Sequence, residues 1–134
     1  ANPSAARPST IDAAALCKMA DRGQIKGAMV DGPLAFDNAV SAHAAQIKQI
    51  VSPVAGDADI LVAPDLEAAN MLAKQLEYMA GASGAGVVLG ARVPIALTSR
   101  ADGPAVRMGS ALIALLVAHH LRSDPLRQLQ LRQA

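Results

Sequence analysis

The sequence predicts a single α/β domain whose mixed sheet is mainly parallel in its first half and has an antiparallel element later. Short apolar runs that stop at Gly or Pro alternate with longer segments of helical apolar spacing, which is the pattern of strands alternating with helices. The chain has 134 residues, of which 52% are hydrophobic and 1% aromatic. This is enough apolar chain for one domain, and its small aliphatic side chains suit helices packed closely on a sheet.

The first helix is predicted to start at Ser9 and Thr10, which are N-cap residue types, and to end at Gly23. Its inward face carries apolar residues one helical turn apart: Ala13, Leu16, Cys17 and Ala20. The apolar run at residues 27–30 then predicts a strand, because the Asp-Gly-Pro sequence that follows it is typical of a turn.

Three further elements continue the alternation. Ser41 is predicted to cap a second helix that closes at Pro53, since the residue before a proline is driven out of the helical region. Residues 60–63 are continuously apolar and predict a second strand. The helix that follows runs to Gly81, with an inward apolar stripe of Leu66, Ala69, Ala73, Leu76 and Ala80.

The last part of the chain breaks the alternation. Residues 86–89 and 94–98 both predict strands, and the connector between them is too short for a crossover helix, so we expect an antiparallel pair. Residues 103–121 predict a helix that is apolar on all sides and should therefore be covered on more than one side. We expect one α/β lobe over residues 1–122 and a polar tail over residues 123–134.

Composition argues against several classes of function. A net charge of +1 with one Tyr and one Phe gives neither the electrostatic nor the stacking surface of a nucleic-acid-binding protein. The single Cys17 permits no internal disulfide, and the N-terminus lacks a secretory apolar region, so we expect a cytoplasmic protein. The longest apolar stretch, residues 111–118, is far shorter than the about 20 residues of a membrane span. His119 and His120 point about 100° apart on a helix, so no metal site is expected there.

Polar side chains follow three of the apolar runs, where ligands bind in open α/β sheets. The Ser99-Arg100 pair precedes the long helix and combines a hydroxyl, a guanidinium and free N–H groups, which suit a phosphate or a developing oxyanion. The candidate binding residues at the other two strand ends are Asp31, Asp65, Asn70 and Lys74.

Each of these residues also has a purely structural interpretation. Ser99 and Asp102 have the spacing of a capping box, and Arg100 could be a solvated side chain. Asp65 to Lys74 could be the solvated face of a helix, and Asp31 could belong to a simple turn.

Several blocks of sequence carry a resemblance to a known family. They are DGPLAFDNA at residues 31–39, AGD at 55–57, APDLEAANMLAK at 63–74 and VVLGARVPIALTSRAD at 87–102. In this order they resemble the C-terminal half of the phosphate acetyltransferase/phosphate butyryltransferase family over about residues 9–121. They are similar in particular to its butyryltransferase-like branch and to the acyltransferase part of bifunctional enoyl-CoA hydratase/phosphate acetyltransferase proteins.

The resemblance implies acyl transfer between coenzyme A and inorganic phosphate, with acyl-CoA as a substrate, no tightly bound cofactor, no metal and no covalent enzyme intermediate. It implies that Arg100 binds phosphate and that Ser99 helps to stabilise the transition state. Related phosphate acetyltransferases have an aspartate in the helix after this pair, where this chain has Val106. Asp102 is the nearest acid that could take the thiol proton.

The resemblance also implies a three-layer lobe like those of isocitrate and isopropylmalate dehydrogenases. Members of the family have a second α/β domain across a cleft, so we expect this chain to be a fragment, inactive alone and dimeric through exposed apolar surface. The alternative is a non-catalytic domain that binds acyl-CoA and holds oligomers together, as in acyltransferase-like domains fused to malic enzymes.

Overall fold

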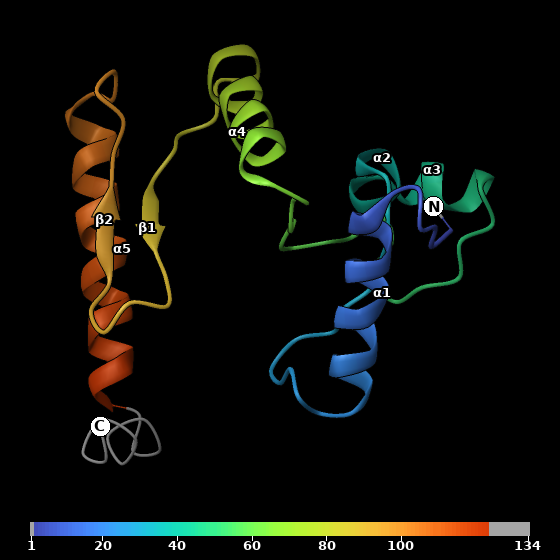
Figure 1. The fold of residues 1–134 in the computed structure, drawn as a ribbon. Helices are drawn as coiled ribbons and strands as arrows, with labels where there is room; N and C mark the ends of the chain where they lie inside the picture. Colours follow the sequence, from blue (N-terminus) through green and yellow to red (C-terminus); the bar gives the residue numbers. More distant parts are fainter. Residues whose placement is uncertain (1, 124–134) are drawn as a thin grey trace. The chain divides into compact units, whose positions relative to one another are not determined.

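The computed structural model describes residues 2–123, and its helices and strands are labelled in Figure 1. In chain order they are α1 (Pro8–Asp21), α2 (Phe36–Val40), α3 (Ala42–Ile47), α4 (Leu66–Ala80), β1 (Gly86–Val88), β2 (Ile95–Leu97) and α5 (Pro104–Ser123). The chain divides into two compact units, one up to Ala69 and one from Asn70. The single lobe over residues 1–122 stays a prediction.

Helix α1 ends as predicted but begins earlier. Gly23 has a φ of +71°, and its N–H donates to the Ala20 carbonyl at 2.9 Å, which is the left-handed helix stop that the sequence indicated. The predicted cap at Ser9 and Thr10 is wrong, because the helix starts at Pro8, whose fixed φ suits a first helical position. Thr10 is buried, and its hydroxyl donates to the Arg7 carbonyl at 2.7 Å.

The second predicted helix is shorter than expected, and a helix that was not predicted precedes it. Ser41 does cap α3, since its Oγ accepts from Ala44 N at 3.3 Å, but α3 ends at Ile47 and a short α2 precedes it. Lys48 joins the two helices through a 2.7 Å ion pair with Asp37, and this hydrogen bond lowers the pKa of the Asp37 carboxyl. Buried Ala39 and Ala45 form the small core of this unit.

The two strands predicted for the first unit are not formed in the described chain. Residues 27–30 and 60–63 lack strand structure, and residues from both runs line one open cavity of about 520 Å³. A strand requires a neighbour that satisfies its N–H and C=O groups, and neither run has such a neighbour here. The sheet in the described residues is accordingly one antiparallel pair, and a mainly parallel sheet is not seen.

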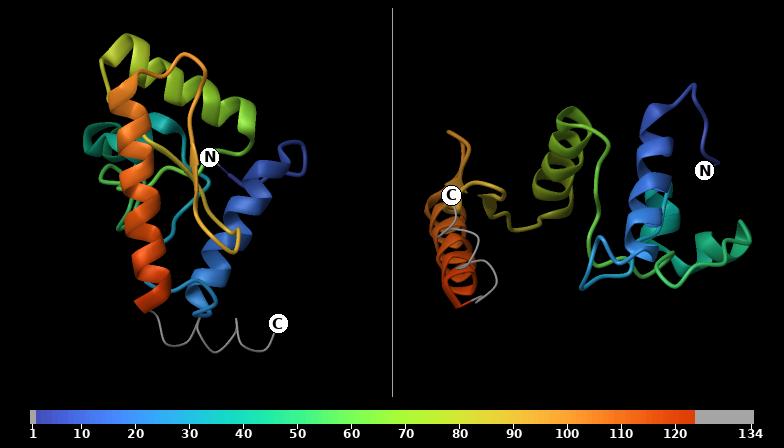
Figure 2. Two further views of the ribbon diagram at one scale, coloured as in Figure 1. Left: turned by 90° about the vertical axis from the view of Figure 1, so that its left-hand side faces the viewer. Right: turned by 60° about the horizontal axis from the view of Figure 1, so that its bottom comes forward.

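The second unit contains the predicted hairpin and long helix. Strands β1 and β2 are antiparallel, with Gly86 opposite Leu97 and Val88 opposite Ile95. Helix α5 packs along both strands, as Figures 1 and 2 show. Ser110 fixes this contact: it is fully buried, its Oγ accepts from Gly86 N at 3.0 Å and donates to the Val106 carbonyl at 2.8 Å.

The apolar faces of α4 and α5 are less covered than predicted. Helix α4 ends before Gly81, whose φ is +69°, but none of its residues is buried. Among residues 2–123, helix α5 is covered on the hairpin side only, and its exposed apolar stripe consists of Met108, Leu112, Leu115 and Leu116. With 20 residues and a mean hydropathy of 1.3, α5 is long and apolar enough to cross a membrane, a test that core helices of soluble proteins also pass.

Candidate functional site

The candidate site is built around the turn of residues 99–102, between the end of β2 and the start of α5. The Asp102 N–H donates to the Ser99 carbonyl at 3.2 Å, which closes the turn. The Asp102 carboxylate accepts from the Ser99 N–H at 2.6 Å, a short charge-assisted bond. The Ser99 Oγ accepts a longer bond from Ala101 N at 3.4 Å, which leaves its O–H free to donate.

The bond between Ser99 and Asp102 is half of the capping box that the spacing suggested, but it braces a turn rather than a helix end. Helix α5 begins only at Pro104, after this turn. The structural interpretation and the functional one are therefore compatible, because the contact that holds the backbone leaves the Ser99 hydroxyl and the Arg100 side chain available.

Arg100 occupies the exposed centre of the turn. Within residues 2–123 its guanidinium makes no hydrogen bond or ion pair, so its fork of donors is available to a ligand. The first turn of α5 contains no acidic residue, and its positive helix end adds to the attraction for an anion. Among the predicted candidates, Ser99 and Arg100 thus form the arrangement best suited to bind an oxyanion.

Lys74 is the candidate from α4 that lies within electrostatic range of this turn. Its Nζ is 2.7 Å from the Glu77 carboxylate and 5.5 Å from the centre of the Tyr78 ring. The hydrogen bond to Glu77 raises the pKa of the Lys74 ammonium, with smaller contributions from Tyr78 and Asp102. Asn70, one helical turn earlier, is exposed in the same unit.

Asp31 and Asp65 belong to the first unit and make local structural contacts. The Asp31 carboxylate accepts from Gly32 N at 2.8 Å. The Asp65 carboxylate accepts from Ala68 N at 2.7 Å, which is an N-cap interaction for α4. The structure thus brings Ser99, Arg100 and Asp102 into one turn. Lys74 lies near enough for the charge of Asp102 to contribute to raising its pKa.

Arg107 is a residue of this site that the sequence did not single out. From the first turn of α5 its Nε donates to the Asp102 carbonyl at 3.0 Å. Its Nη2 lies 3.4 Å from the Ser99 carbonyl oxygen and 3.5 Å from that of Arg100. The only signal in the sequence is a cation near a helix N-terminus, where the helix dipole disfavours it.

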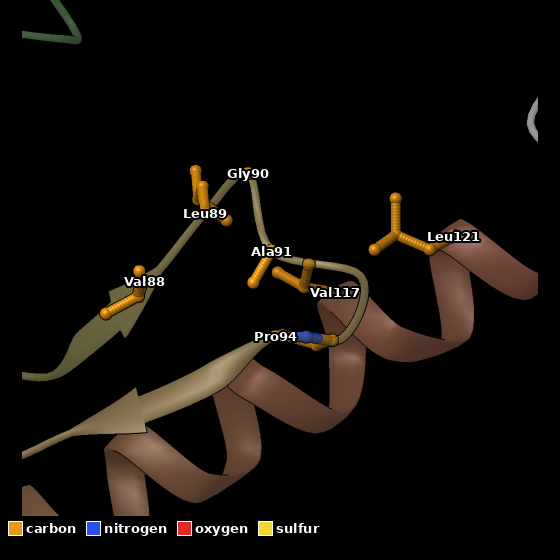
Figure 3. A pocket seen from close by; sticks show the side chains of 7 residues that line it. All are labelled: Val88, Leu89, Gly90, Ala91, Pro94, Val117 and Leu121. Atoms are coloured by element: carbon orange, nitrogen blue, oxygen red, sulfur yellow. The ribbon is translucent and has the colours of Figure 1, made fainter. Parts of the chain in front are cut away.

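Other features of the described chain carry less chemistry. An apolar cavity of about 240 Å³ lies between the β1–β2 connector and the last turns of α5, at the other end of β2 from the turn (Figure 3). No group of three metal-ligating side chains occurs in residues 2–123. Burial raises the pKa of the Cys17 thiol, with Asp31 adding to the effect, so this thiol stays protonated at neutral pH.

A family model described as phosphate acetyl/butaryl transferase matches residues 1–115. A phosphate acetyltransferase from Rhizobium meliloti is 63% identical over 116 residues, which are 87% of this chain and 37% of that protein. A phosphate butyryltransferase from Clostridium beijerinckii is 50% identical over 110 residues, covering 82% of this chain and 36% of that protein. The chain thus spans roughly a third of the length of these curated relatives.

A solved structure matches the fold of this chain as well. The crystal structure of a branched-chain phosphotransacylase from Enterococcus faecalis matches with a TM-score of 0.73 and 35% sequence identity, over 88% of this chain and 42% of that chain. This confirms the mixed helix-and-strand fold, which the chain shares with a segment of that phosphotransacylase. The position of the segment within the longer chains stays a prediction.

Proposed function

Since this chain belongs to the phosphate acetyl/butaryl transferase family, we propose that it is part of an enzyme that transfers an acyl group between coenzyme A and inorganic phosphate. The reaction is acyl-CoA + phosphate ⇌ acyl phosphate + CoA. The observation that carries this proposal is the exposed Ser99-Arg100 turn, which offers an anion a hydroxyl, a guanidinium and a helix N-terminus.

The residues of the turn have distinct proposed roles. Arg100 binds the phosphoryl oxygens of the acyl phosphate or of free phosphate, since a guanidinium fork matches the geometry of phosphate. When the CoA thiolate attacks the acyl carbonyl, negative charge develops on the carbonyl oxygen, and the Ser99 hydroxyl donates to it. The C–S bond forms, the bond between the carbonyl carbon and the phosphate oxygen breaks, and phosphate leaves.

Asp102 is the proposed acceptor of the CoA thiol proton. One of its carboxylate oxygens already accepts from Ser99 N, so the lone pairs of the other remain for this role. Lys74 presents a cation within range of the same turn, which suits the anionic phosphates of coenzyme A. Asp31, Asp65 and Asn70 are proposed as further substrate-binding residues.

The finer architecture belongs to the same proposal. We propose a three-layer lobe with a mixed, mainly parallel sheet. The apolar runs at residues 27–30 and 60–63 support it, because they would become strands if strands from outside the described residues paired with them. The exposed stripe on α5 supports a homodimer or a covering element of the same enzyme. The enzyme is proposed to be cytoplasmic, with no metal and no tightly bound cofactor. The tail after residue 123 lies outside the described residues.

The test is an assay of thiol release from acetyl-CoA and butyryl-CoA in the presence and absence of phosphate. The complete protein is expected to release CoA only with phosphate and to form one acyl phosphate per thiol. The 134-residue chain alone is expected to show little or no turnover, because it spans only about a third of the length of its curated relatives. Phosphate-independent thiol release would identify a hydrolase and refute the proposal.

One observation favours a second candidate function. Val106 stands where related phosphate acetyltransferases are expected to have an acid, and its side chain cannot exchange a proton. The alternative is a non-catalytic acyl-CoA-binding domain that regulates or assembles a larger protein. Calorimetry that detects acyl-CoA binding to the complete protein, together with no turnover in the thiol-release assay, would establish this alternative.

A further inference from the structure

The orientation of Arg107 is not explained by the fold alone. A surface arginine in the first turn of a helix opposes the helix dipole, and holding its long side chain in one position costs conformational entropy. Within residues 2–123 it pairs with no carboxylate that would offset this cost. Its guanidinium is instead turned back onto the main chain of the turn that carries Ser99 and Arg100.

The contacts of Arg107 differ in strength. The bond from Nε to the Asp102 carbonyl is 3.0 Å, which is an ordinary hydrogen-bond length, and this carbonyl ends the turn. The approaches of Nη2 to the carbonyl oxygens of Ser99 and Arg100, at 3.4 and 3.5 Å, are long and weaker. Together these contacts join Arg107 to the carbonyl oxygens of Ser99, Arg100 and Asp102, and so connect the turn to the helix.

The turn requires a contact of this kind to fix its direction relative to α5. Its own hydrogen bonds connect Ser99 with Ala101 and Asp102, and all of them lie within the turn itself. They fix its internal shape but not its direction relative to α5. Arg107 supplies the connection to the helix, which in turn packs on the hairpin through the buried Ser110.

We propose that Arg107 is a positioning residue that orients Arg100 for phosphate by holding three of the four carbonyl oxygens of the turn. This inference rests on the proposed function. Recognition of phosphate by a guanidinium depends on a fixed geometry, so loosening the turn lowers the fraction of Arg100 side chains that are correctly placed. Arg107 therefore acts on the binding of phosphate and not on that of acyl-CoA.

Steady-state kinetics of the complete protein test this inference. Arg107→Ala is expected to raise the KM for phosphate about tenfold and to leave the KM for acyl-CoA within about twofold of wild type. Arg107→Lys keeps the charge but lacks the planar fork, so it is expected to raise the phosphate KM by about threefold or more. Far-UV circular dichroism of each variant checks that the fold is retained.

A double-variant cycle shows whether Arg107 acts through Arg100. In the Arg100→Ala background, adding Arg107→Ala is expected to change the phosphate KM by less than about twofold, because the residue being positioned is gone. The matched control is Arg122→Ala at the other end of α5, where the guanidinium also donates to a main-chain carbonyl, that of Ala118 at 3.3 Å. This control is expected to leave both KM values unchanged.

Three results would overturn the inference. The first is a phosphate KM in Arg107→Ala equal to that of wild type. The second is full recovery in Arg107→Lys, which would mean that charge alone matters. The third is multiplication of the two effects in the double variant, which would mean that Arg107 binds phosphate independently. A silent Arg100→Ala would refute the proposed function itself, so the two failures are distinguishable.

Discussion

Replacement of Gly56 by alanine is predicted to destabilise the first unit by about 2–5 kcal/mol. Gly56 has a φ of +93°, which costs a residue with a Cβ about 1–2 kcal/mol. A Cβ added there would lie 2.5 Å from Ala42 Cα and 2.7 Å from Ala42 N, at the start of α3. Main-chain atoms cannot rotate away, so the overpacking adds about 1–3 kcal/mol. Any backbone movement that relieves this clash would also disturb the hydrogen bond from Gly56 N to the Ala39 carbonyl, at 3.2 Å.

Urea unfolding followed by far-UV circular dichroism measures this loss of stability. The matched control is Gly27→Ala in the same unit, because Gly27 has a similar φ of +85° but nothing within 4 Å of the added Cβ. It is expected to cost only the conformational part, about 1–2 kcal/mol. Equal losses in the two variants would refute the claim that close packing against Ala42 contributes.

Three more predictions follow from individual contacts. Asp102→Asn keeps an oxygen acceptor for the Ser99 N–H but cannot take a proton, so kcat should fall by about 100-fold with a phosphate KM near wild type; an unchanged kcat would assign the proton to another group. Lys48 lowers the pKa of Asp37 in the folded state, so this pair stabilises the fold above the unfolded-state pKa and is lost as pH falls through the lower folded-state value. Acid unfolding curves of wild type and Asp37→Asn should therefore differ above the unfolded-state pKa of about 3.9 and converge once the pH is below the lower folded-state pKa; curves separated by a constant amount would contradict this. Leu116→Glu, on the exposed stripe of α5, should convert a dimer of the complete protein to a monomer in light scattering; a dimer that persists would place the interface elsewhere.

The parts of the fold that local chemistry determines were predictable from the sequence. Gly23 and Gly81 stop their helices with positive φ, and Ser41 caps α3, because each signal acts within a few residues. The antiparallel hairpin also followed from a short connector that permits no crossover. The strands predicted at residues 27–30 and 60–63 were wrong for the described chain, since strand formation depends on a partner that the run itself does not encode.

The residues of the candidate turn could be predicted from the sequence, but the side-chain contacts that hold the turn in place could not. Ser99 and Arg100 became candidates because they follow a strand and precede a helix, where an open α/β sheet binds ligands. Asp102 became a candidate through the family resemblance, as the acid nearest to Val106. The bond of Asp102 to Ser99 N was foreseen as a capping box, although it closes a turn. Arg107 was missed, because the direction of a long, flexible side chain depends on carbonyl groups that only the folded turn presents.

The measurement that tests the central claim most directly is the phosphate dependence of the complete enzyme with Arg100 replaced by alanine. The account predicts a phosphate KM raised by about 100-fold, because the guanidinium fork is the main phosphate-binding group of the turn, with the KM for acyl-CoA little changed. A phosphate KM equal to that of wild type would contradict the account and would make Arg100 a solvated surface residue.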